Sequence, residues 1–153
     1  MKPINTSFDG YYFRSRLEAK WAVFFKALGL NYSYEKEGYK LNNGDRYLPD
    51  FYIKDWDAFI EIKADKPTAE EIKKCAELNL NSGKLVLLIY GNKPWPGSYK
   101  IKIFDKDENY FEDGIFLQCR RCEGLYYAVG EGEYGDVEVA FARHLSKSDV
   151  VEF

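Results

Sequence analysis

Two carboxylates and a lysine lie close together in the middle of the sequence. Asp50 follows Pro49, and Glu61 and Lys63 come after a short spacer, with Ile62 between them. Carboxylate oxygens are the ligands that Mg²⁺ takes in proteins, and a lysine beside a bound cation can orient water and offset charge on a phosphate. These residue types in this order are therefore candidates for a metal-dependent site that cleaves phosphodiester bonds.

The spacing predicts a hairpin that brings the two carboxylates together. Residues 46–53 and 58–64 have the composition of strands, and a polar turn at 54–57 separates them. Facing residues of an antiparallel pair have position numbers that add to a constant. This turn therefore sets Asp50 opposite Glu61, with their Cβ atoms roughly 4.5–5.5 Å apart on one face.

Alternation along the second strand puts Lys63 on the same face as Glu61 and turns Ile60 and Ile62 toward the core. Two facing carboxylates repel each other, and a divalent cation between them removes the repulsion. The plainer interpretation is an amphipathic hairpin whose exposed face carries Asp50, Glu61 and Lys63. These three residues alone do not decide between the two interpretations.

Helices are predicted on both sides of the hairpin in sequence. A capping-box pattern begins at Ser15, and apolar residues repeat at helical spacing from there to Gly29, a natural stop. A second capping-box pattern at Thr68 opens a helix to about residue 81. Asp136 is expected to cap a last helix over residues 136–145. The remaining strands are expected at 31–35, 39–41, 84–90, 99–104, 115–118 and 125–129.

This order of elements predicts a fold of the α/β (α+β) class with a mixed central sheet flanked by helices. With 153 residues, the chain is long enough to bury a hydrophobic core as one domain. We expect residues 1–153 to form that domain, with a core at about 8–105 and a smaller, β-rich C-terminal extension at about 106–153.

Composition argues against several classes of protein. A net charge of −3 argues against binding nucleic acid through overall positive charge, although local basic patches matter more than the total. No apolar run approaches the roughly 18 residues of a membrane span, and the first residues lack the apolar segment of a signal peptide. Three cysteines fit a reduced compartment better than a disulfide framework. We expect a cytoplasmic protein without a membrane partner.

The motif Pro49-Asp50…Glu61-Ile62-Lys63 resembles the signature of the PD-(D/E)XK nuclease superfamily, which includes restriction endonucleases and phage endonuclease I. The segment at 13–21, which contains Arg-Ser-Arg-Leu-Glu-Ala, is similar to a helix that precedes these strands in small phage and bacterial nucleases. The resemblance covers roughly the first 90 residues. It implies a restriction-endonuclease-like core in a protein from the cytoplasm of a bacterial or phage-infected cell.

The resemblance also implies a role for each motif residue. Asp50 and Glu61 would bind Mg²⁺, for which Mn²⁺ can substitute, together with the carbonyl oxygen of Ile62. Lys63 would be the catalytic lysine. Glu18, on the first helix, matches a further acid that many members use to complete the metal site. However, Glu18 is also the N3 residue of the first capping box, and a carboxylate tied to its own helix start would be structural.

Basic side chains close to these motifs are candidates for contacts with DNA phosphates. Arg14, Arg16 and Lys20 surround the start of the first helix, and Lys73 lies on the helix after the hairpin. The alternative for each is a solvated helix face. Spacing does not decide between Lys73 and its neighbour Lys74.

Cys119 and Cys122 have the spacing of half a zinc site. A structural zinc site needs four ligands, usually with a second close pair, and Cys75 is distant and expected to be packed in a helix. We therefore interpret residues 119–122 as a degenerate zinc knuckle that keeps its hairpin without metal. Zn²⁺ binding is the alternative.

Taken with the resemblance, the motif predicts a metal-dependent endonuclease that hydrolyses DNA through a Mg²⁺-activated water. A homodimer that acts as a structure-specific resolvase would be a subtype of this function. The alternative from a different class is a catalytically silent nuclease-fold module that binds nucleic acid or regulates a partner in a phage or mobile element. The acidic net charge suits this alternative slightly better.

Overall fold

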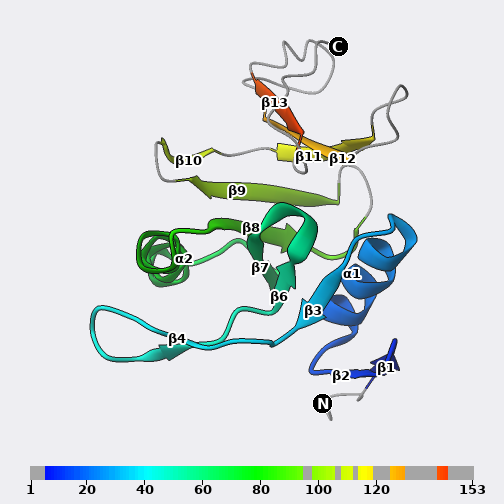
Figure 1. The fold of residues 1–153 in the computed structure, drawn as a ribbon, viewed down its shortest axis with the longest axis horizontal. Coiled ribbons are helices and arrows are strands. Elements are labelled where there is room, and N and C mark those ends of the chain that lie inside the picture. The colour runs from blue at the N-terminus through cyan, green and yellow to red at the C-terminus, as the bar shows by residue number, and fades with distance from the viewer. Residues whose placement is uncertain are drawn as a thin grey trace.

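A mixed six-stranded sheet is the centre of the fold (Figure 1). The computed structural model describes residues 6–94 and 98–105, together with the backbone of strands at 108–111, 114–118, 125–129 and 141–144. The sheet order is β10-β9-β8-β7-β6-β3, in which β7 and β8 are parallel and all other neighbours are antiparallel. These strands are β3 (Tyr32–Tyr34), β6 (Phe51–Ile53), β7 (Ala58–Lys63), β8 (Leu85–Gly91), β9 (Tyr99–Asp105) and β10 (Glu108–Phe111). The predicted α/β (α+β) class with a mixed sheet is confirmed.

The parallel pair in the sheet exists because a helix returns the chain between its two strands. α2 (Ala69–Ser82) connects β7 to β8, as a parallel connection requires. Thr68 caps its start with both hydrogen bonds of the predicted capping box. Gly83 ends it in the left-handed conformation with φ of 70°, which glycine adopts without strain. Sequence alone therefore located both ends of α2 to within a residue or two.

The two helices pack on opposite faces of the sheet. From α1 (Arg16–Ala27), Trp21 and Phe25 join a buried cluster with Ile60 and Ile62 of β7. From α2, Leu78 and Cys75 join a second cluster with Phe59, which alternation turns to the other face. The nearly continuous apolar run of β8 follows from this arrangement, because its Leu87 and Ile89 contact the first cluster and its Val86 and Leu88 the second.

Three smaller sheets lie around this core. β1 (Thr6–Phe8) pairs with β2 (Tyr11–Phe13), and β4 (Tyr39–Lys40) pairs with β5 (Arg46–Tyr47). The third sheet has the order β11 (Gly114–Gln118), β12 (Leu125–Val129) and β13 (Phe141–His144). In the part of the chain described here, no helix is long and apolar enough to cross a membrane.

Three sequence expectations need correction or extension. The strand expected at 46–53 is divided into β5 and β6, because Pro49 cannot donate a ladder hydrogen bond and interrupts it. The last helix expected at 136–145 is wrong where the structure describes it: Phe141–His144 is β13, paired antiparallel with β12. Pairing with a neighbouring strand outweighs the helical spacing of apolar residues there. β1, β2 and β10 were not predicted.

Candidate metal centre

The hairpin has the register that the sequence predicts. Phe51 pairs with Ile60 and Ile53 with Ala58, and the turn between them is a 3₁₀ segment (Lys54–Trp56) followed by Asp57. Asp50 comes immediately before Phe51, and Glu61 comes immediately after Ile60, the last residue of β7 that pairs with β6. Both are buried, with 5% of Asp50 and 7% of Glu61 exposed. The position that the sequence predicts is confirmed, but the two carboxylates lie inside the molecule and not on an exposed face.

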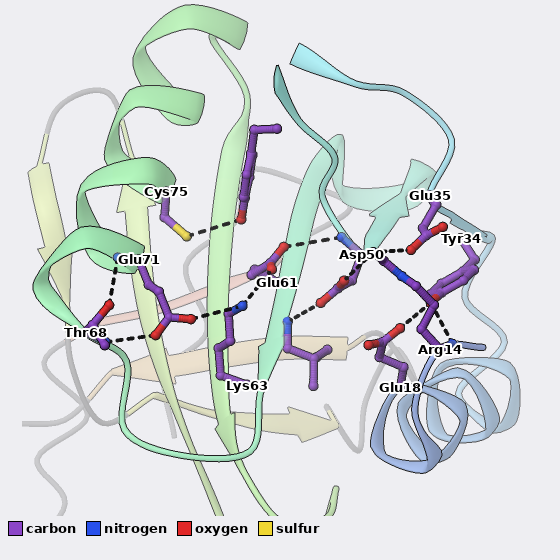
Figure 2. A network of polar contacts seen from close by, with 12 residues as sticks. Arg14, Glu18, Tyr34, Glu35, Asp50, Glu61, Lys63, Thr68, Glu71 and Cys75 are labelled. Atoms are coloured by element: carbon purple, nitrogen blue, oxygen red, sulfur yellow. Dashed lines mark hydrogen bonds and ion pairs between the residues drawn. The ribbon is translucent and has the colours of Figure 1, made fainter. Parts of the chain in front are cut away.

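Asp50 and Glu61 are joined through each other's strand backbone (Figure 2). The Oδ2 atom of Asp50 accepts a hydrogen bond from the Ile62 N–H at 2.8 Å. The Asp50 N–H donates to Oε2 of Glu61 at 3.4 Å. Ile62 lies two positions beyond Ile60, the last residue of β7 that pairs with β6. The Asp50 side chain therefore accepts the Ile62 N–H in place of a backbone carbonyl of β6. This bond fixes the carboxylate of Asp50 at the end of the hairpin.

Glu18 reaches the same place from α1. Ser15 caps the helix by accepting from the Glu18 N–H at 3.1 Å. The carboxylate of Glu18, however, accepts a hydrogen bond from the Tyr34 hydroxyl at the end of β3. The carboxylate of Glu18 is therefore not tied to its own helix start: only its backbone N–H takes part in the cap, while its side chain faces Asp50 (Figure 2).

Glu35 is a further acidic residue of this site that sequence reasoning missed. Ligand oxygens of Glu18, Glu35 and Asp50 lie within 4.8 Å of one another, a group that Glu61 does not join. Glu35 has a φ of 49°, in the left-handed region that glutamate rarely adopts, and its N–H donates to the Asp50 carbonyl at 2.9 Å. Strand alternation does not hold at this residue, so the pattern of β3 gave no signal for it.

Arg14 contacts the acidic group of Glu18, Glu35 and Asp50 through two of its members. Its guanidinium forms an ion pair with Glu35 and lies 4.0 Å from Oδ1 of Asp50. Its backbone N–H donates to the Tyr34 hydroxyl at 3.1 Å. The side chain is nevertheless 63% exposed, so it can leave the carboxylates at little cost.

Lys63 approaches Glu61 from the other side. Its Nζ atom lies 3.4 Å from Oε1 of Glu61 and 3.0 Å from Oε2 of Glu71 on α2. Burial alone would lower the pKa of Lys63, but its hydrogen bonds and the charges of the two glutamates outweigh that effect and raise it. The ammonium group therefore remains charged beside Glu61.

Burial dominates the protonation of the two central acids. Loss of hydration raises the pKa of Asp50, and the negative charges of Glu61 and then Glu18 raise it further, against the hydrogen bond from Ile62. Burial also raises the pKa of Glu61, although a hydrogen bond from Tyr47 and the charge of Lys63 oppose it. Burial therefore disfavours the charged form of both acids, and a bound cation would favour it.

The donor set of the site fits a hard divalent cation. Four carboxylates, those of Glu18, Glu35, Asp50 and Glu61, face two cationic side chains. Oxygen ligands of this kind suit Mg²⁺ or Mn²⁺ and not a zinc site built from sulfur or nitrogen. Glu18, Glu35 and Asp50 are the residues whose oxygens lie close enough together to share one ion. Glu61 contacts Asp50 beside that group, and Glu61 and the Ile62 carbonyl stay predicted ligands.

The other predicted site residues are exposed on the helices or fall outside the described residues. Arg16, Lys20 and Lys73 are exposed on the two helices. Cys119 and Cys122 fall outside the described residues. Comparison of the chain with models of protein families and with curated proteins found no match in either case. The functional argument therefore depends on the geometry of the site.

Proposed function

We propose that this protein is a metal-dependent endonuclease that hydrolyses phosphodiester bonds of DNA. The observation that carries the proposal is the buried Asp50–Glu61 pair with Lys63 at 3.4 Å from Glu61. Two buried carboxylates destabilise each other, and such a cost is typical of functional sites. The motif that these residues form resembles that of PD-(D/E)XK nucleases, which supports the same reaction.

In this proposal Asp50, Glu61, the Ile62 carbonyl and Glu18 hold the ion. A bound Mg²⁺ supplies a Lewis acid that lowers the pKa of water and polarises the phosphate. The ammonium of Lys63 orients the attacking water and stabilises negative charge that develops on the phosphate oxygens. The hydrogen bond between Ile62 and Asp50 keeps one carboxylate in place during the reaction.

Exposed basic side chains at the start of α1 are suited to hold the DNA backbone beside this centre. Arg14 contacts the acidic group directly, and Arg16 and Lys20 are exposed within the next two turns. Phosphate contacts of this kind position a substrate without reading its sequence.

A cleavage assay tests the proposal directly. Purified protein with Mg²⁺ or Mn²⁺ is incubated with linear, supercoiled, single-stranded and four-way-junction DNA, and with RNA. We expect cleavage of at least one DNA form, lost in Asp50→Asn and Lys63→Ala. The matched controls are Asp65→Asn and Lys66→Ala, exposed residues of the loop before α2. Retained cleavage by Lys63→Ala would exclude the assigned site, and no cleavage of any DNA by the wild type would exclude the function.

A second candidate is a nuclease-fold module that binds nucleic acid or a partner without turnover. The position of Arg14 favours it, because a protein cation already lies against Glu35 and Asp50. Calorimetric titration with Mn²⁺ separates the two functions. If the protein is a nuclease, the wild type should bind Mn²⁺ and Asp50→Asn should not. If it is a module whose acidic group is neutralised by Arg14, neither the wild type nor Asp50→Asn should bind Mn²⁺.

A further inference from the structure

The start of α2 lies against Lys63 and contacts it through one residue. Oε2 of Glu71 is 3.0 Å from Nζ of Lys63, whose other partner is Glu61 at 3.4 Å (Figure 2). We propose that Glu71 is a positioning residue that holds the ammonium of Lys63 beside Glu61, a role that rests on the proposed nuclease function. It would fix the lysine by using the capping box of a helix as a rigid support.

The capping box fixes Glu71 at both ends. The Glu71 N–H donates to Oγ1 of Thr68 at 3.2 Å, and Oε1 of Glu71 accepts from the Thr68 N–H at 3.0 Å. Only the other carboxylate oxygen, Oε2, is turned to Lys63. A glutamate held in one rotamer by its own helix start offers the lysine a fixed partner, and the lysine loses its rotamer freedom to a prearranged site.

Electrostatics gives Glu71 a second function there. The N-terminus of α2 carries the positive end of the helix dipole, which repels a nearby ammonium group. The carboxylate of Glu71 lies between the helix start and Lys63 and reverses that field. Without this negative charge, Lys63 would lose one of its two carboxylate partners, and its side chain would no longer be held on the side of α2.

Glu70 provides a comparison within the same turn. It is also acidic, but its side chain is 78% exposed and its ion pair is with Lys74 at 3.8 Å, on the outside of the helix. The same charge change at Glu70 therefore alters the helix start without touching Lys63. The rival explanation, that Glu71 only stabilises α2, predicts that changes at Glu70 and Glu71 affect helix stability alone.

Glu71→Gln and Glu70→Gln are the matched variants for the test. Glutamine can complete a capping box, so Glu71→Gln removes the charge facing Lys63 while it keeps the helix start. Mobility of the Lys63 side chain, measured by NMR relaxation, should increase in Glu71→Gln and remain unchanged in Glu70→Gln. Equal mobility of Lys63 in both variants would overturn the proposal, whether or not the protein cleaves DNA.

Cleavage kinetics provide the second measurement. Glu71→Gln should lower kcat about tenfold with little change in KM, as loss of a supporting partner typically does, while Glu70→Gln should match the wild type. An unchanged kcat in Glu71→Gln, or an equal loss of kcat in Glu71→Gln and Glu70→Gln, would overturn the proposal. If the wild type does not cut DNA, the nuclease function fails, and the NMR measurement alone decides whether Glu71 holds Lys63.

Discussion

Asp50 is destabilising as an anion, so its replacement is expected to stabilise the metal-free protein. Its folded-state pKa is raised by burial and by the charges of Glu61 and Glu18. The unfolded chain releases this proton at about pH 4, whereas the folded protein keeps it up to about pH 8. The stability that the group contributes below about pH 4 is therefore lost as the pH rises from about 4 to about 8. Asp50→Asn keeps an oxygen that can accept from Ile62 and removes this pH dependence.

With metal removed by EDTA, Asp50→Asn should raise the free energy of unfolding by about 1 kcal/mol or more at neutral pH. The gain should shrink at about pH 5, which lies nearer the pKa of Asp50 in the unfolded chain, so that less free energy is lost in keeping the carboxyl protonated on folding. Urea unfolding at both pH values measures it, with the exposed Asp65→Asn as control. A destabilised Asp50→Asn at neutral pH would contradict the assigned origin of the raised pKa.

Arg14 competes with a metal ion for Asp50 and Glu35. Its ion pair with Glu35 and its 4.0 Å approach to Asp50 must be given up, at least in part, when a divalent cation enters. Removing the guanidinium should tighten Mn²⁺ binding about threefold, because a largely exposed ion pair is worth at most about 1 kcal/mol. Calorimetry on Arg14→Gln measures this, and Arg16→Gln should bind Mn²⁺ like the wild type. Weaker binding in Arg14→Gln would indicate that Arg14 organises the acidic group.

Sequence predicted the central residues of the site better than its periphery. Asp50, Glu61 and Lys63 belong to one hairpin, so a constant register and strand alternation sufficed to place them. Glu35 was not predicted, because its backbone is in the left-handed conformation just after β3. The direction of its side chain therefore does not follow the alternation of residues along a strand. The position of Glu18 depends on Tyr34, a partner from another element, and local pattern says nothing of such a partner.

At the scale of elements, the two capping boxes share one sequence pattern and differ in structure. In α2 the pattern closes fully, with Glu71 returning to the Thr68 N–H. In α1 the Ser15 side chain caps the helix, but Glu18 turns to Tyr34 instead of closing the box. A tertiary hydrogen bond decides between the outcomes, so the sequence predicts where each helix starts but not where the glutamate points.

Loss of the cap oxygen at α2 should therefore cost stability. Thr68→Ala removes the acceptor for the Glu71 N–H and should lower the free energy of unfolding by about 1 kcal/mol. Thr68→Ser retains a hydroxyl at the same position and should lose much less. Urea unfolding of the two variants gives the comparison, and equal losses would show that packing of the threonine methyl group, and not the cap, stabilises this turn.

The predictions for the strands also depended on how much of each strand is set by local sequence. Proline divides the run expected at 46–53, a local effect that the sequence contains but that a count of β-formers overlooks. β13 was expected to be helical because its apolar spacing suited both structures, and its pairing with β12 decided the matter. By contrast β8, an apolar strand with helices on both faces of its sheet, was predicted nearly to the residue.

At the scale of the whole molecule, the candidate metal centre joins elements that are otherwise far apart in the chain. Glu18 comes from α1, Glu35 follows β3, Asp50 precedes β6 and Glu61 lies on β7. The class of the fold followed from the order of its elements, but the meeting of these four acids depends on the sheet order. A cation bound by Glu18, Glu35 and Asp50, from three separate segments, would stabilise the fold as a unit, because the unfolded chain does not assemble its ligands.

This arrangement predicts how metal should affect global stability. At a free Mn²⁺ concentration of 100 times its Kd, the free energy of unfolding should rise by about 2.7 kcal/mol over the EDTA-treated protein. Asp50→Asn should begin from a more stable metal-free state and gain almost nothing from Mn²⁺, so that metal reverses the order of the two proteins. The measurement is urea unfolding of both proteins with and without Mn²⁺, with Asp65→Asn as the matched control. Among the described residues, Asp50 alone belongs both to the group with Glu18 and Glu35 and to the pair with Glu61. If Asp50→Asn gains as much free energy of unfolding from Mn²⁺ as the wild type, the ion therefore binds elsewhere.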